Sequence, residues 1–239
     1  CEVVISDARY TGRPRDALVE AVRESGCDWV INAIGKIPQR CADPDELLQA
    51  NALLPVHLST RTLPNQQLIH ASTDCVFNGQ RGLYRVDEAC DAEDEYGFSK
   101  LLGEAIGADP RTTVIRTSII GPDLTGGHGL MGWFLSQTDE VRGFVNHFWN
   151  GLTTLEWAKI TCELIQGRLA PGTVYQAATR DGTSKYELLR LIGEVWNHPI
   201  PISPVKVDPA VDRRLVPTLV RKPLREQLEE LRSWYEGAA

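Results

Sequence analysis

Three short apolar segments, each flanked by stretches of helical periodicity, constrain the fold of this chain more than any other feature. They are residues 28–33, 67–73 and 113–117. Segments of this length, rich in branched and aromatic residues, are typical of strands buried on both faces of a parallel sheet. Amphipathic stretches lie between them at residues 16–25, 45–61 and 95–106. Their alternation with the strands predicts an α/β fold with a doubly wound, Rossmann-like parallel sheet.

Two further regions complete the expected elements. The apolar run at residues 3–5 is predicted to be a short strand. From residue 121 onward the chain is richer in Gly and Trp, and helices are expected at residues 152–166, 184–196 and 223–235. With 239 residues, 42% of them apolar, the chain can form one large domain or a domain with a smaller lobe.

Tyr96 and Lys100 are the strongest candidates for chemistry. They are four residues apart on a predicted helix and therefore share one face. A cation beside a phenol lowers the tyrosine pKa from about 10, which suits a general acid or base near neutral pH. A hydroxyl from the preceding strand, Thr73 or Ser72, would hold a carbonyl oxygen against the phenol. This layout indicates carbonyl reduction by hydride, and the alternative is a half-buried tyrosine beside a solvated lysine.

Four motifs occur in order: Ile31-Asn-Ala-Ile-Gly35, His70-Ala-Ser-Thr-Asp-Cys-Val-Phe77, Tyr96-Gly-Phe-Ser-Lys100 with Gly103-Glu104, and Arg116-Thr-Ser118. Together they make the chain, from about Asp16 to Trp234, resemble the extended short-chain dehydrogenase/reductases. The similarity is greatest to the dTDP-4-dehydrorhamnose reductase branch. Residues 143–155 further resemble relatives encoded for bacterial capsule or O-antigen sugars. The resemblance implies a dinucleotide-binding domain at residues 1–120 and, mainly, a smaller interwoven substrate lobe at residues 121–239.

The resemblance also implies roles for individual residues. Tyr96 is expected to be the general acid, Lys100 to lower its pKa and reach the nicotinamide ribose, and Thr73 to hydrogen-bond the substrate oxygen. The cofactor, NADPH with NAD as the alternative, is expected to contact Asn32, Ala33, Gly35, Ser72, Tyr96, Lys100, Arg116 and Ser118. The substrate is expected to contact Cys75, Phe77, Asn146, Trp149, Asn150 and Arg213. Structural alternatives stay open, such as a buried ion pair for Arg116 and a core position for Trp149.

The sequence departs from the family pattern at its start. A dinucleotide-binding fold normally opens with a strand, a glycine-rich turn and a helix, which bind the pyrophosphate. No such turn precedes Asn32, and the glycine-rich stretches at residues 79–82 and 121–129 do not open a helix after a first strand. We expect the missing elements to belong upstream of Cys1, so that the fold is N-terminally truncated. The alternative is a variant that has lost cofactor binding.

Composition restricts the partners. The net charge of -7 and the lack of any Lys/Arg run argue against a nucleic acid partner. No stretch of about 18 apolar residues is present, so we expect no membrane span and a cytoplasmic location. The six cysteines and five histidines, Cys1 and His128 included, are scattered, and no metal site is expected. A homodimer is one expected assembly.

Three functions follow from these observations. The first is NAD(P)H-dependent reduction of a nucleotide-linked keto-sugar in bacterial surface-polysaccharide biosynthesis. The second is a non-catalytic nucleotide-binding or regulatory subunit on the same fold, which the missing glycine loop favours and the intact Thr73, Tyr96 and Lys100 disfavour. The third is a nucleotide-sugar epimerase, which would hold its cofactor tightly without net consumption.

Overall fold

The computed structural model describes residues 2–13, 15–41, 43–122 and 129–237. Cys1, His128 and most of the glycine-rich stretch 121–129 lie outside these residues. The chain divides into two compact units. Unit 1 consists of the chain up to Val76, Cys90–Arg116 and Thr161–Tyr175, and unit 2 consists of Phe77–Ala89, Thr117–Ile160 and the chain from Gln176 onward.

A parallel sheet forms the centre of unit 1. Its strands β1 (Trp29–Asn32), β2 (Gln67–Ala71) and β3 (Thr112–Arg116) lie side by side. Every residue of β3 is buried, as expected for a strand covered on both faces. The order of the five-stranded sheet is β1-β2-β3-β8-β12. Strand β8 (Val174–Thr179) passes from unit 1 into unit 2, where its later residues pair in parallel with β12 (Leu219–Arg221).

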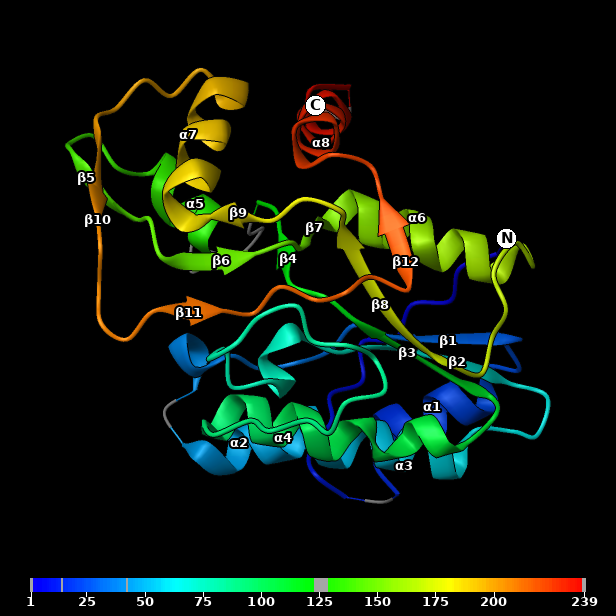
Figure 1. Cartoon of the computed structure of the whole chain (residues 1–239). Coiled ribbons are helices and arrows are strands. Elements are labelled where there is room, and N and C mark those ends of the chain that lie inside the picture. Colours follow the sequence, from blue (N-terminus) through cyan, green and yellow to red (C-terminus); the bar gives the residue numbers. More distant parts are fainter. Residues whose placement is uncertain (1, 14, 42, 123–128, 238–239) are drawn as a thin grey trace. The chain divides into compact units, whose positions relative to one another are not determined.

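Helices α1 to α4 lie along one face of β1, β2 and β3 (Figure 1). These helices are α1 (Ala17–Glu24), α2 (Pro44–Leu48), α3 (Leu54–Arg61) and α4 (Glu95–Gly103). The π-helical turn η2 (Gln49–Leu53) lies between α2 and α3. The 3₁₀ segments are η1 (Pro38–Arg40), η3 (Asp74–Val76) and η4 (Glu104–Ala108). Apolar side chains of α1, α3, β1, β2 and η4 form the core of this unit: Leu18, Val19, Val30, Leu54, Leu58, Leu68 and Ile106.

Unit 2 combines short strands with helices. The strands are β4 (Ile119–Ile120) with β7 (Leu152–Thr153), β5 (Val141–Phe144) with β10 (Ile202–Val205), and β6 (His147–Trp149) between β9 (Thr183–Ser184) and β11 (Val211–Asp212). The helices are α5 (Leu130–Leu135), α7 (Lys185–Trp196) and α8 (Leu224–Gly237), while α6 (Thr154–Ile165) continues into unit 1. Ser184 and Glu187 form a capping box that starts α7.

The predicted α/β class with a Rossmann-like parallel sheet is confirmed. The three predicted strands are β1, β2 and β3. The helix predicted at residues 45–61 is interrupted by the π-helical turn, and the one predicted at residues 95–106 ends as a 3₁₀ segment. The prediction of a strand at residues 3–5 is wrong. Val3 and Ile5 are 78% and 85% exposed, so no neighbouring strand buries the apolar run.

Candidate active site

Helix α4 carries both Tyr96 and Lys100, and two close contacts fix its first turn. The carboxylate of Asp94 accepts a hydrogen bond from the backbone N–H of Gly97 at 2.7 Å and caps the helix. A Cβ atom on Gly97 would lie 2.2 Å from the carbonyl oxygen of Cys75. Only glycine therefore allows the first turn of α4 to approach the segment that follows β2.

The Thr73 hydroxyl and the Tyr96 phenol are hydrogen-bonded to each other. Thr73 is buried, and its hydroxyl donates to Asp74 at 3.2 Å and accepts from the N–H of Cys75 at 3.1 Å. The two hydroxyls therefore meet at the end of β2, where one substrate oxygen can contact both.

Burial raises the pKa of Tyr96 well above its usual value, and the nearby Cys75 thiol adds to the rise. The hydrogen bond from Thr73 acts in the opposite direction and is outweighed. The expectation that Lys100 lowers this pKa is therefore wrong for this structure. A phenol with a raised pKa keeps its proton at neutral pH, which is the form that a general acid needs.

Lys100 is directed to the strand rather than to the phenol. Its buried ammonium donates to the carbonyl oxygen of Ala71, the last residue of β2, at 2.6 Å. Burial lowers the pKa of Lys100 to about 8, although the charge of Glu104 opposes the decrease. Near pH 7 the side chain is therefore mostly charged, but close to its titration range.

Ser72 and Arg116 meet at one buried carboxylate. Glu104 accepts a hydrogen bond from the Ser72 hydroxyl at 2.5 Å and two from Arg116, at 2.9 Å from Nε and 2.7 Å from Nη2. The Arg116 and Glu104 side chains are 9% and 6% exposed. The sequence left a buried ion pair open as the alternative for Arg116, and the structure contains that ion pair. Contact of Ser72 and Arg116 with a cofactor stays a prediction.

The segment after β1 lies beside these groups. Ala33 and Gly35 are exposed, whereas Asn32 is buried and its amide contacts His70 Nδ1 at 3.1 Å and accepts from the N–H of Ile34 at 3.2 Å. A Cβ atom on Gly35 would lie 3.9 Å from the Lys100 ammonium. This exposed strand end therefore brings open backbone close to Lys100.

Asn51 is a site residue that the sequence analysis missed. It lies in the π-helical turn, fully buried, and its amide donates to the Ser99 hydroxyl at 3.0 Å and to the Lys36 carbonyl oxygen at 2.9 Å. Its oxygen accepts from the N–H of Lys36 at 2.9 Å. Asn51 thus ties α4 to the loop after β1, and π-helical turns often occur at functional sites. An asparagine among the apolar residues of a predicted helix was the available signal.

In unit 2, several predicted substrate contacts have structural partners. Asn150 donates to the carbonyl oxygens of Thr179 and Leu215 at 3.1 and 2.8 Å and accepts from the Leu215 N–H at 2.9 Å. The Asn146 amide makes two hydrogen bonds with the backbone of Val207. Both side chains therefore hold loops together.

Phe77 and Arg213 also contact each other within unit 2. Phe77 is fully buried and stacks on Tyr84, with ring centroids 4.4 Å apart. Arg213 donates from Nε to the carbonyl oxygen of Phe77 at 3.2 Å. Cys75, in unit 1, is partly exposed, and its thiol contacts Asp74 at 3.5 Å. Substrate contact by these residues stays a prediction.

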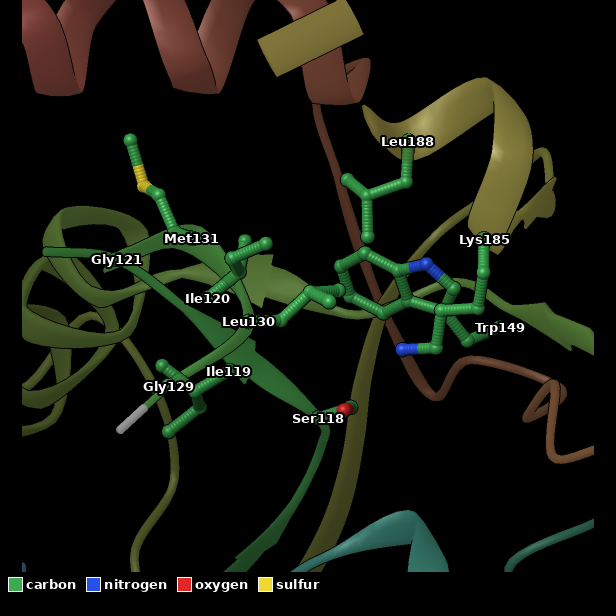
Figure 2. A pocket seen from close by; sticks show the side chains of 10 residues that line it. All are labelled: Ser118, Ile119, Ile120, Gly121, Gly129, Leu130, Met131, Trp149, Lys185 and Leu188. Carbon is green, nitrogen blue, oxygen red and sulfur yellow. The ribbon is translucent and has the colours of Figure 1, made fainter. Parts of the chain in front are cut away.

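A cavity of about 80 Å³ in unit 2 brings Ser118 and Trp149 together (Figure 2). Apolar side chains of β4, α5 and α7 line it beside these two residues. The Lys185 ammonium lies 5.0 Å from the centre of the Trp149 ring, within the range of a cation–π contact. The indole N–H of Trp149 is buried and has no hydrogen-bond partner among the residues that the structure describes. The cavity thus combines an apolar wall with hydrogen-bond donors.

Residues 2–13, 15–41, 43–122 and 129–237 contain no group of three or more His, Cys, Asp or Glu side chains that is placed to hold a metal ion. Within the same ranges no helix is both long enough and apolar enough to cross a membrane.

The sequence matches the RmlD substrate binding domain family over residues 5–237. The chain belongs to this family. The predicted resemblance to dTDP-4-dehydrorhamnose reductases is thereby confirmed at the family level. No curated protein matches the sequence.

Solved structures have the same fold as this RmlD-family chain. A dTDP-4-dehydrorhamnose reductase from Bacillus anthracis in complex with NADP gives a TM-score of 0.77 at 18% identity, over 91% of this chain and 83% of that chain. A hypothetical dTDP-4-dehydrorhamnose reductase from Sulfolobus tokodaii gives 0.72 at 22% identity, over 87% and 81%. WbmG from Bordetella bronchiseptica, in complex with NAD and UDP, gives 0.69 at 17% identity, over 92% and 77%.

Two groups of predicted site residues come together in this RmlD-family chain, one in each unit. Thr73, Tyr96 and Lys100 come together in unit 1, with Ser72, Cys75 and Arg116 close to them in the same unit. Ser118 and Trp149 come together in the cavity of unit 2. The roles of the individual residues stay predictions.

Proposed function

We propose that the protein reduces the keto group of a nucleotide-linked sugar with NADPH, NADH being the alternative donor. We further propose that it acts in the cytoplasm, in bacterial surface-polysaccharide biosynthesis. The observation that carries the proposal is the hydrogen bond between Tyr96 and Thr73, one helical turn from Lys100. Membership of the RmlD family supports it, as do the NADP and NAD named in two of the similar structures.

The chain's own groups supply the proton and orient the substrate. Thr73 and Tyr96 both hydrogen-bond the keto oxygen, which fixes it at the end of β2. Bound NADPH supplies the hydride that the carbonyl carbon receives. Negative charge then develops on the oxygen, and Tyr96 transfers its phenolic proton to it. The raised pKa of Tyr96 keeps that proton in place until the charge develops.

The residues near β1 fit a nicotinamide cofactor. The Lys100 ammonium has three N–H donors, and one of them goes to Ala71. The remaining donors lie beside the exposed backbone of Ala33–Gly35, where ribose hydroxyls would accept them. Asn51 keeps this segment at a fixed distance from α4 through its bonds to Lys36 and Ser99. We therefore assign the nicotinamide ribose to this strand end.

We assign unit 2 mainly to the substrate. The domain division expected at residue 120 stays a prediction, since Phe77–Ala89 belongs to unit 2 and Thr161–Tyr175 to unit 1. The Trp149 N–H, the Lys185 ammonium and the Ser118 hydroxyl are groups that can donate hydrogen bonds to a ligand, and the walls of the cavity are apolar. A nucleotide-linked sugar offers acceptor oxygens on its diphosphate and sugar. The class of ligand therefore matches the donors of this cavity.

A homodimer is proposed through unit 1. Large apolar side chains are exposed on α4 and on the adjacent α2–η2 segment: Phe98 is 50%, Leu102 42%, Leu53 41% and Leu48 38% exposed. Phe98 and Leu102 are four residues apart and share one face of α4. Exposed large apolar side chains on neighbouring elements are typical of an interface. Sedimentation of the purified protein tests it, and Phe98→Glu is expected to give monomers.

A direct assay tests the reductase proposal. The purified protein is mixed with NADPH and a panel of dTDP- and UDP-linked keto-sugars, and NADPH consumption and the reduced product are measured. Tyr96→Phe should lower kcat by at least about 10²-fold and leave NADPH affinity nearly unchanged. Tyr175→Phe, which removes a phenol bonded to the Ala170 carbonyl, is the matched control. Tightly held cofactor with no net consumption would instead identify an epimerase.

A further inference from the structure

Glu104 stands at the junction of the three elements that form the proposed site. It is the first residue of η4, four positions after Lys100 and eight after Tyr96. Its carboxylate binds Ser72, which follows β2, and Arg116, the last residue of β3. A buried carboxylate is costly unless it is well bonded, and here the Ser72 hydroxyl and the Arg116 guanidinium both donate to it.

These bonds continue directly into the reacting groups. Ala71, Ser72 and Thr73 are consecutive, and each is bonded to a residue of the α4–η4 helix: Ala71 to Lys100, Ser72 to Glu104 and Thr73 to Tyr96. The Ser72 N–H also donates to the Ile115 carbonyl oxygen at 2.8 Å, which keeps this segment in line with β3. Three hydrogen bonds thus join the end of β2 to one helix. Glu104 accepts the middle one, from Ser72.

We propose that Glu104 is a positioning residue for the reduction: by holding Ser72 and Arg116 it keeps the Thr73 hydroxyl in reach of the Tyr96 phenol. The inference rests on the proposed function for its role in turnover, while the geometry itself is a property of the folded chain. Loss of the carboxylate frees Ser72 and with it the backbone of Thr73. A displacement of about 1 Å at a reacting group is enough to lower a rate about 10²-fold.

Glu104 also acts on the charge of Lys100. Two ionisable groups of the described residues are close enough to act on this ammonium, Glu104 on its own helix and His70 on β2. Arg116 on β3 is paired with Glu104. Burial and the neighbouring Lys100 charge hold the pKa of His70 well below its usual range, so His70 is neutral. The charge of Glu104 opposes the effect of burial on Lys100. Without that charge the pKa of Lys100 falls below about 8.

The test compares Glu104→Gln with Glu156→Gln. Glu156 is a second buried carboxylate, 3% exposed and paired with Arg221 in unit 2, so its loss matches the structural cost without touching α4. The ¹³C NMR titration of Lys100 should move to lower pH by about one unit or more in Glu104→Gln and stay in place in Glu156→Gln. The turnover rate of Glu104→Gln should fall by at least about tenfold near pH 8 and recover in part at lower pH, where Lys100 is protonated again.

Two results overturn the inference: an unmoved Lys100 titration in folded Glu104→Gln, or a loss of kcat that is the same at every pH and is also seen in Glu156→Gln. If Glu104→Gln does not fold, Glu104→Met/Arg116→Met replaces the ion pair with apolar groups of similar volume. The Lys100 titration and the turnover rate are then measured in this double variant. Ser72→Ala removes only the hydrogen bond between Ser72 and Glu104, and an unchanged kcat in this variant also contradicts the proposal. A wild-type chain without reductase activity refutes the proposed function, whereas the NMR titration still reports on Glu104.

Discussion

The Lys100 ammonium donates to the carbonyl oxygen of Ala71 at 2.6 Å, so the cation is bound to the end of β2 and not to the phenol one turn earlier. It is buried, and its pKa is about 8. A cation in such a place costs folding free energy. The charged Lys100 therefore lowers the stability of the folded chain. Its titration near pH 8 should make both the stability and the reaction rate depend on pH.

The first concerns stability. The pKa of Lys100 is about 8 in the folded chain and 10.5 when exposed, so between these values the unfolded chain holds more protons and stability rises with pH. Lys100→Met removes the titration. We expect the difference in unfolding free energy, variant minus wild type, to be largest near pH 7. It should decrease by up to about 3 kcal/mol as the pH approaches 10.5, because the wild type gains stability over this range. Urea unfolding measures it, and Lys159→Met, at an exposed lysine, should show no such change between about pH 8 and 10.

The second concerns rate. If the charged ammonium holds the ribose, kcat/KM should fall as the pH rises through about 8. Lys100→Met should bind NADPH more weakly and retain a small activity without this alkaline decrease. Initial rates across the pH range, with NADPH titrations at each end, measure both effects. An alkaline limb that persists unchanged in Lys100→Met would assign it to another group.

Gly97→Ala should separate α4 from the segment after β2. Its Cβ atom would lie 2.2 Å from the Cys75 carbonyl oxygen, so backbone has to move. We expect a loss of about 2–3 kcal/mol in unfolding free energy and a loss of turnover larger than the loss of NADPH affinity. Gly237→Ala, where the added atom meets nothing within 4 Å, is the control. Equal thermal stability of the two variants would show that this helix has room to shift.

Trp149→Phe keeps an aromatic wall in the cavity and removes the unbonded indole N–H. We expect KM for the nucleotide-sugar to rise by about 10-fold, with kcat and NADPH affinity nearly unchanged, because a hydrogen bond to the substrate is lost. Lys185→Met should also raise KM, since its ammonium lies over the same ring. Steady-state kinetics measure both variants. A KM that does not change in either variant would mean that the substrate lies elsewhere.

Asn150→Leu distinguishes a structural role from substrate binding. The side chain bonds to Thr179 and to both backbone groups of Leu215, all within unit 2. Its removal leaves buried backbone groups unbonded, and we expect a loss of about 3 kcal/mol in unfolding free energy. Chemical denaturation measures it. A variant of normal stability with a raised KM would favour direct contact with the substrate.

The strands and the order of elements were predictable because they depend on local patterns. The apolar runs at Trp29–Asn32 and Thr112–Arg116 are buried in the parallel sheet as their composition indicates. The apolar run at residues 3–5 shows the limit of that signal, because composition does not reveal whether a partner strand is present. The π-helical turn around Asn51 was equally hidden, since it depends on the contacts of that amide with Lys36 and Ser99.

The electrostatics of the candidate site could not be predicted from spacing. Tyr96 and Lys100 are close in sequence, but the effect of one on the pKa of the other depends on where the ammonium finds its acceptor. Burial proved larger than the charge effect for both groups. The pairing of Arg116 with Glu104 joins residues of different elements, and only the folded chain decides between that pairing and a ligand contact.

The interleaving of the two units also has a consequence for synthesis of the chain. Unit 1 needs Thr161–Tyr175 for completion, and the ribosome makes these residues after Phe77–Ala89 and Thr117–Ile160 of unit 2. Unit 1 therefore cannot finish folding before the ribosome has added Tyr175. By then two of the three segments of unit 2 have been made, and they must wait, partly unpaired, for the chain from Gln176 onward. Both units are consequently expected to reach their final structure late in translation, and a nascent chain halted before Tyr175 should depend on chaperones.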